Sequence, residues 1–203
     1  MDSPSPPSKR RRKNECGDDT SSSPVVVFAH GAGAPSSSDW MIKWKDMLGK
    51  ALDAVEVVTF DYPYIAGGKR KAPPKAEKLV EFHTDVVKGA VAKFPGHPLI
   101  LAGKSMGSRV SCMVACKEDI AASAVLCLGY PLKGMNGAVR DELLLQITVP
   151  IMFVQVPFLL SLSNIIEKEF YLLVMVLKLS KLSDLWSPSP IWFNLLLIKI
   201  ECL

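Results

Sequence analysis

The chain has 203 residues, of which 49% are hydrophobic and 22% are charged. This length suits one domain with a substantial core, and the aliphatic content excludes a wholly disordered chain. The formal net charge is only +4, from 24 Lys and Arg against 20 Asp and Glu, which is too small to indicate nucleic-acid binding. Composition therefore favours a single α/β or α+β domain without direct nucleic-acid contacts.

The N-terminal segment differs from the rest of the chain. Residues 1–24 are rich in Ser, Pro and charge, so we expect a disordered tail. They contain no apolar stretch of the kind that a secretory signal needs. The run from Lys9 to Lys13 is basic, and it is either a nuclear-import signal or part of a solvated tail with no such role. We expect the protein in the nucleus or the cytoplasm.

From residue 25 to residue 155, apolar strand patterns alternate with helical patterns. The first apolar run is continuous and β-branched, as in a strand buried on both faces. This alternation predicts a three-layer α/β fold with a mostly parallel sheet. The expected strands are 25–29, 55–60, 99–102, 123–128 and 149–155, and the expected helices are one capped by 36–39 and ending near 52, then 73–93 and 106–116.

Ser105 carries the strongest chemical signal in the sequence. It lies at the centre of Gly103-Lys104-Ser105-Met106-Gly107, which matches G-x-S-x-G between an expected strand and an expected helix. A tight turn there would lift the hydroxyl above the sheet edge, beside the free N–H of the first helical residue. We expect Ser105 to be a nucleophile and the Met106 N–H to be half of an oxyanion hole.

The other half is expected from the loop that follows the first strand, residues 30–35. Gly31 and Gly33 allow this backbone to approach a substrate closely, so the N–H of Ala32, or that of Gly31, is the expected second donor. Four further residues are candidates for lining the same site: His30, Gly33, Asp61 and Lys104.

The same glycines allow two phosphate-binding interpretations, and both are disfavoured. Residues 102–105 resemble the end of a G-x-x-x-x-G-K-[ST] loop, but Pro98 occupies the first glycine position and an apolar strand fills the loop. Residues 31–33 could open a dinucleotide fingerprint, yet Ser36 stands where the third glycine is required. We expect no cofactor.

Five stretches of the chain resemble one family. They are FAHGAGAPSSSDW, LAGKSMGSRV, GYPLKG, VRDELL and PIMFVQ, within residues 24–155. The family is an α/β-hydrolase-like group, related to dienelactone-hydrolase-like enzymes, that includes the testis-expressed hydrolase-like proteins and a subunit of the NSL histone-acetyltransferase complex. The resemblance implies an α/β-hydrolase fold, with Ser105 as nucleophile and His30–Gly33 with Met106 as the oxyanion region.

The chain departs from this family after Gln155. An acid-bearing turn, a later strand and a loop with the triad histidine follow in the family, but here no histidine occurs after His97. We therefore expect a fold without its last strand and helix, and a site without the triad acid and His. Residues 25–155 form the expected domain. The segment 156–203 is hydrophobic and unlike the family, and we hypothesise a retained intron or alternative exon, because valine codons such as that of Val156 begin with GT. A family-specific extension is the alternative.

None of the three histidines is expected to replace the missing base. His30 is closest to the serine and is expected to be structural, His83 to be solvated on a helix, and His97 to lie in a turn. Asp61 follows a strand at the sheet edge where sites form, so a direct role for it stays open.

The remaining candidates have ordinary explanations. Lys104 and Arg109 either contact an acidic group or lie exposed at the helix start. Cys112 and Cys116 are spaced i, i+4 on a helix but lack further ligands, so we expect core thiols and no metal site. The five cysteines include no C-x-x-C and indicate reduced thiols.

Two functions are compatible with these patterns. The first is an acyl- or ester-hydrolase-type domain, impaired in this chain, whose partner is a small acyl or ester substrate. The second is a non-catalytic nuclear scaffold whose partners are proteins of a chromatin-associated complex. The apolar run 170–177 is far shorter than the ~20 residues needed to cross a bilayer, so we expect no membrane span. The sequence does not identify a substrate.

Overall fold

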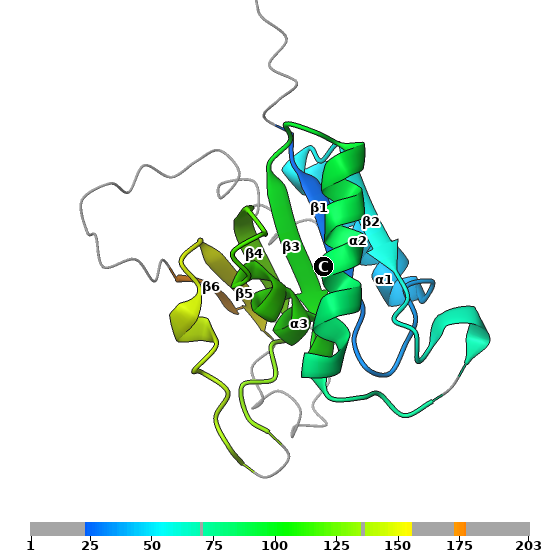
Figure 1. Ribbon diagram of the computed structural model, residues 1–203, viewed down its shortest axis with the longest axis vertical. Coiled ribbons are helices and arrows are strands. Elements are labelled where there is room, and N and C mark those ends of the chain that lie inside the picture. Colours follow the sequence, from blue (N-terminus) through cyan, green and yellow to red (C-terminus); the bar gives the residue numbers. More distant parts are fainter. Residues whose placement is uncertain (1–22, 70, 135–136, 156–172, 178–203) are drawn as a thin grey trace, which may run out of the picture.

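The computed structural model describes residues 23–69, 71–134, 137–155 and 173–177. Within them, six strands form one sheet in the order β2-β1-β3-β4-β5-β6 (Figure 1). The first five strands run parallel, and the sixth is antiparallel to its neighbour. The strands are β1 (Val25–Ala29), β2 (Glu56–Phe60), β3 (Leu99–Lys104), β4 (Ala122–Leu128), β5 (Ile151–Gln155) and β6 (Leu173–Leu177).

Helices cover both faces of the sheet. In the described part of the chain, α1 lies on one face, and α2 and α3 lie together on the other (Figure 1). The predicted three-layer α/β arrangement is therefore confirmed. The helices are α1 (Asp39–Leu52), α2 (Val80–Lys93) and α3 (Met106–Ala115), with short 3-10 turns η2 (Ala66–Gly68), η3 (Ala76–Leu79) and η4 (Leu144–Gln146).

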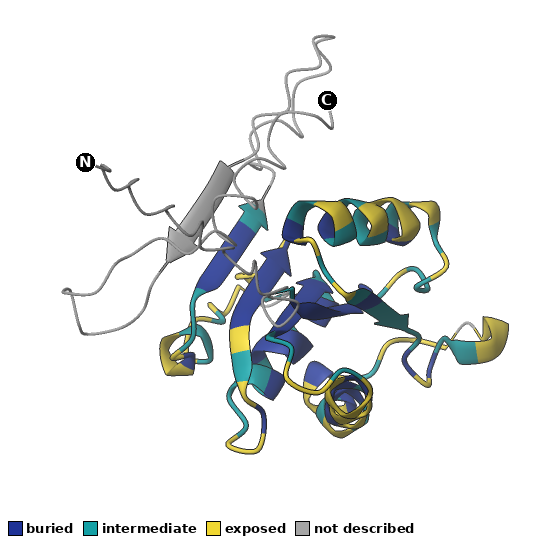
Figure 2. Ribbon diagram, turned by 90° about the horizontal axis from the view of Figure 1, so that it is seen from above, coloured by how far each residue is buried: buried dark blue, intermediate teal, exposed yellow. Residues whose placement is uncertain are grey.

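The central strand β1 shows why its sequence has no polar alternation. All five of its residues are fully buried. Val25 and Val27 face the core under α2 and α3, whereas Val26 and Phe28 face the core under α1. A strand covered on both sides needs apolar residues at every position. Figure 2 shows the same pattern, with buried strands at the centre and exposed residues on the outer sides of the helices.

Two predicted boundaries were placed too early, and both involve prolines. We expected a helix from residue 73, but the chain forms η3 first and α2 begins only at Val80. A residue that precedes proline avoids the helical conformation, so Pro74 keeps residue 73 extended. Similarly, β5 begins at Ile151 instead of residue 149, because Pro150 has no N–H to contribute to a strand ladder.

The edge strand β6 was not predicted from the sequence. It pairs antiparallel with β5, in a register that places Leu177 opposite Ile151 and Leu173 opposite Gln155. An edge strand leaves a row of backbone N–H and C=O groups unpaired, and any extended segment can satisfy them. The expectations for residues 156–172 and 178–203, and for the basic tail up to residue 22, lie outside the described residues. No helix in the described part of the chain is long and apolar enough to cross a membrane.

The expectation that His83 is solvated is wrong. It lies on the buried side of α2, with a fully buried side chain, and its Nδ1 lies 3.1 Å from the hydroxyl of Tyr62. The ring also packs against Phe60, with centroids 4.9 Å apart. Burial disfavours the charged imidazolium and lowers the pKa of His83 to about 3. The folded protein therefore holds this histidine neutral.

Buried His83 predicts a specific loss of stability in acid. Between the model-peptide pKa of 6.5 and about 3, the unfolded chain binds a proton at this position and the folded chain does not. As the pH is lowered through this window, the free energy of unfolding should therefore decrease, by about 1 kcal/mol per pH unit from His83. Chemical denaturation at a series of pH values measures this slope, which should become shallower in His83→Gln.

His97→Gln is the matched control, because His97 is partly exposed and, among the described residues, its Nδ1 lies 2.8 Å from the Ser23 carbonyl oxygen. Its slope should equal that of the wild-type protein. An NMR titration that finds His83 protonated near pH 6 in the folded protein would contradict the assignment.

Candidate active site

Ser105 occupies a strained turn between β3 and α3. Its φ of 50° and ψ of −112° place it in a region that residues with a side chain rarely adopt. The turn is held by its own backbone: the Ser105 N–H donates to the Leu128 carbonyl at 2.9 Å. The Ser105 carbonyl accepts from the Ser108 amide at 3.1 Å and from the Ser108 hydroxyl at 2.6 Å. Neighbouring β4 and α3 thus fix the conformation of the serine.

Two glycines make this turn sterically feasible. A Cβ on Gly103 would lie 2.4 Å from backbone atoms of Gly107 and Ser108, and one on Gly107 would lie 2.5 Å from the His30 carbonyl oxygen. Such contacts are far inside van der Waals distance and involve backbone that cannot rotate away. Only glycine at both positions allows α3 to start this close to β3 and to the loop after β1.

The loop after β1 lies against the serine turn. β1 and β3 are neighbours, with Ala29 opposite Gly103, so their C-terminal ends meet at one edge of the sheet. A Cβ on Gly31 would lie 3.6 Å from the Ser105 Cβ and 3.3 Å from the Lys104 carbonyl oxygen. The loop and Ser105 are therefore in contact distance, as an oxyanion site requires. That Met106, Ala32 or Gly31 donates to an oxyanion stays a prediction.

His30 and Tyr64 orient the peptide between Gly31 and Ala32. The Gly31 carbonyl oxygen lies 2.6 Å from His30 Nδ1 and accepts from the Tyr64 hydroxyl at 3.4 Å. Because a trans peptide points its C=O and N–H in opposite directions, the Ala32 N–H points away from these two rings. Sequence analysis did not single out Tyr64, because no motif connects it with the loop.

The hydrogen bonds of His30 fit the structural role that the sequence analysis expected, which stays a prediction. A carbonyl only accepts, so Nδ1 carries the proton, and Nε2 accepts from the Tyr62 N–H at 3.1 Å. The ring is fully buried, and burial lowers its pKa. With both nitrogens bonded to backbone groups, neutral His30 has no free nitrogen to accept a proton from Ser105.

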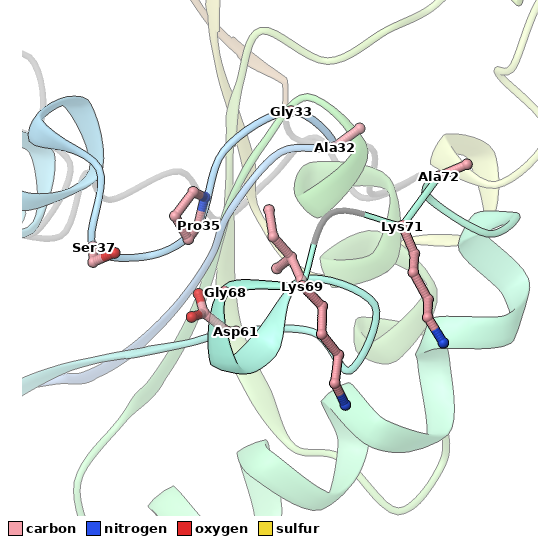
Figure 3. Close-up of a pocket in the computed structure, with 10 residues that line it drawn as sticks. Ala32, Gly33, Pro35, Ser37, Asp61, Gly68, Lys69, Lys71 and Ala72 are labelled. Carbon is pink, nitrogen blue, oxygen red and sulfur yellow. The ribbon is translucent and has the colours of Figure 1, made fainter.

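Two cavities adjoin the loop after β1. The first, which we call the serine pocket, has a volume of about 690 Å³ and is lined by Ser105, Met106 and Ala32, among other residues. The second, the Asp61 pocket, has the same volume and also contains Ala32, together with Gly33 and Asp61 (Figure 3). The structure thus brings Ser105, Met106 and Ala32 together, and places Gly33 and Asp61 in the adjacent cavity.

Asp61 binds the backbone of the same loop. It directly follows β2, and its carboxylate accepts from the Ser36 N–H at 2.6 Å. Its side chain is 28% exposed, and its oxygen lies 4.0 Å from His30 Nε2. Figure 3 shows Asp61 on the side of its pocket formed by β2 and η2, with Lys69 and Lys71 farther along the chain. In this position, Asp61 stabilises the loop through its hydrogen bond to the Ser36 N–H.

Lys104 turns away from the serine. Its ammonium lies 3.8 Å from the centroid of the Trp40 ring on α1, a cation–π contact, and burial lowers its pKa. Arg109 instead lines the serine pocket and lies 3.3 Å from Glu77. Arg140 lines it as well. Arg140 belongs to the VRDELL stretch, but it is far from Ser105 in the sequence, so the sequence analysis did not predict that it lines this pocket.

Cys112 on α3 is a core thiol, and Cys116 directly follows the helix. Cys112 is fully buried, and its sulfur lies 3.6 Å from that of Cys127 on β4. Cys116 is half-buried and is a free thiol. Among the described residues, no group of His, Cys, Asp and Glu side chains is arranged to hold a metal ion.

This architecture defines the class of protein. A parallel sheet carries a strained serine turn between a central strand and a helix, next to a glycine-containing loop from the neighbouring strand. The sequence pattern of the α/β hydrolase domain matches residues 22–156, and the chain belongs to this family. Its fold is the α/β-hydrolase fold.

Two individual proteins illustrate the relationship. The chain is 27% identical over 128 residues to a monoglyceride lipase homolog of Monkeypox virus, which covers 59% of this chain and 42% of the relative. The match thus spans less than half of the relative's length. An α-β serine hydrolase homologue from Coxiella burnetii has a similar structure, with a TM-score of 0.51 and 19% identity over 65% of this chain and 61% of that chain. At this identity the likeness concerns the fold alone.

The glycine contacts predict a large effect of one methyl group. Gly103→Ala should lower the free energy of unfolding by at least about 2 kcal/mol, because its Cβ meets backbone and the turn must open to admit it. Gly89→Ala is the control, since this glycine is exposed on α2 with no atom within 4 Å of an added Cβ. It should stabilise the helix by about 0.5 kcal/mol. Urea denaturation measures both, and equal stabilities would contradict the packing argument.

Proposed function

We propose that this chain is a serine-hydrolase-type domain for acyl or ester chemistry, with Ser105 as the nucleophile. The observation that carries the proposal is the strained φ of Ser105 at a strand-to-helix turn that abuts the Gly31 backbone. Strain of this kind is retained where it positions a reactive group. The oxyanion donors in this proposal are the N–H groups of Met106 and Ala32, with Gly31 as the alternative.

We infer that turnover by this chain is slow. A serine hydroxyl is a weak nucleophile unless a neighbouring base takes its proton. The three histidines of the chain all serve other purposes: His30 and His97 bond backbone carbonyls, and His83 is enclosed near Tyr62. Loss of a triad member costs roughly four to six orders of magnitude in rate. Our proposal takes the triad acid and His to be missing from this site, as the departure from the family pattern after Gln155 implies, and therefore predicts residual activity at most.

The substrate class of the proposal is a carboxylic ester. The monoglyceride lipase homolog supports an ester, although the chain covers only 42% of that relative. The serine pocket, at about 690 Å³, has room for a small acyl group and its leaving group.

Labelling with a fluorophosphonate probe tests the assignment of Ser105. We expect slow, time-dependent labelling that is lost in Ser105→Ala and retained in Ser123→Ala, whose serine is exposed on β4. Mass spectrometry of the labelled peptide identifies the site. Equal labelling of Ser105→Ala would contradict the nucleophile, and labelling as fast as that of an intact serine hydrolase would contradict the impaired site.

The alternative is a non-catalytic scaffold subunit of a nuclear complex. It is supported by the resemblance to the NSL-complex subunit and by the basic run from Lys9 to Lys13. Complete absence of labelling, together with nuclear accumulation of the protein, would favour it.

Fluorescence microscopy of a tagged protein tests the basic run. Replacement of its five basic residues by alanine should abolish nuclear accumulation if the run is an import signal. An unchanged distribution would assign the run to a solvated tail.

A further inference from the structure

The serine pocket is strongly cationic. Its lining includes Lys75, Arg109 and Arg140, against the single carboxylate of Glu77 in the described residues. The three cations come from separate parts of the chain: the loop before η3, helix α3, and the loop after β4. Charges of one sign that converge on a cavity bearing a candidate nucleophile raise the local concentration of an oppositely charged ligand.

Arg109 is not fully satisfied within the described protein. It lies one helical turn after Ser105, and its Nε is buried without a hydrogen-bond partner among the described residues. Among the described residues, the Arg109 guanidinium donates to the Glu77 carboxylate at 3.3 Å, and the Glu77 side chain is 59% exposed. A buried N–H of a charged group that lacks an acceptor is costly, so the site is expected to supply one.

Arg140, which also lines the pocket, is held in place by hydrogen bonds of its backbone. Its N–H donates to the Leu132 carbonyl at 2.8 Å, and its carbonyl accepts from the Tyr130 hydroxyl at 3.1 Å. In the side chain, one terminal nitrogen donates to the Pro131 carbonyl at 3.3 Å. A guanidinium carries five N–H donors, so this contact leaves capacity for a ligand. Arg140 is thus positioned independently of Arg109.

We propose that the serine pocket binds the anionic group of its ligand, a carboxylate or a phosphate, through Arg109 and Arg140. Guanidinium groups bind both anions with paired hydrogen bonds, which a neutral ester cannot provide. In the free protein, Glu77 partly neutralises Arg109 and competes with the ligand. The inference rests on the proposed function in one respect: the ligand is taken to be an ester whose reacting carbonyl lies near Ser105.

A binding titration of the full-length protein tests this proposal without requiring turnover. The probes are monomethyl succinate for a carboxylate, phenyl phosphate for a phosphate, and methyl butyrate as a neutral ester. Amide NMR shifts give the Kd and locate the site. Both anionic probes, or one of them, should shift amides near Ser105 and Arg140, and the neutral ester should bind at least about tenfold more weakly.

Substitutions in the pocket should change the Kd of the anionic probes in opposite directions. Arg109→Gln and Arg140→Gln should each weaken anion binding by about tenfold. Glu77→Gln should strengthen it, because it removes the competing carboxylate. Lys43→Gln is the control, since Lys43 is an exposed cation on α1, across the sheet from the pocket, and its Kd should be unchanged. Arg109→Lys, which keeps the charge but not the fork of donors, serves if Arg109→Gln does not fold.

The outcomes separate this inference from the proposed function. Equal Kd values for neutral and anionic probes, or a wild-type Kd in both arginine variants, would overturn the anion site even if Ser105 is labelled. Conversely, Ser105→Ala should lose labelling but still prefer the anionic probes to the neutral ester. Anion binding without any fluorophosphonate labelling would keep this inference and refute the serine-hydrolase function.

Discussion

The close backbone contact between the end of β3 and the start of α3 is the constraint on which the site depends. Gly103 meets the backbone of Gly107 and Ser108, and Gly107 meets the end of β1. These contacts leave no room for side chains at the two glycines, and the intervening Ser105 has a positive φ of 50°. The turn thus joins three elements, β1, β3 and α3, and its strain is supported by the most buried part of the molecule.

The sheet makes this arrangement rigid. β1 is buried on both faces, and its register against β3 brings the loop after Ala29 beside the serine turn. His30 then anchors that loop by bonding backbone on both of its ring nitrogens. Histidine here provides structure, because a fully buried ring in such surroundings remains neutral and its nitrogens are already bonded. These bonds order the loop, and they leave neither nitrogen of His30 free to act as a base for Ser105.

The chemistry of the serine pocket follows from charge more than from catalytic groups. Arginines from α3 and from the loop after β4 line the cavity that also contains Ser105. In our proposal, a positioned serine beside cationic side chains binds an anionic ester and hydrolyses it slowly. If so, binding and turnover respond to different substitutions.

The sequence by itself determined the parallel sheet, the order of its first five strands and helices along the chain, and the position of the serine turn. Each of these depends on local chemistry: a strand buried on both faces must be apolar throughout, and a G-x-S-x-G turn needs glycine where backbones touch. Only the folded protein shows that His83 is buried beside Tyr62, that Asp61 lines a separate pocket, that Arg140 lines the same cavity as Ser105, and that residues 173–177 extend the sheet. The physical reason is that periodicity reports the faces of one element, whereas these contacts join segments whose proximity is set by strand register and loop path.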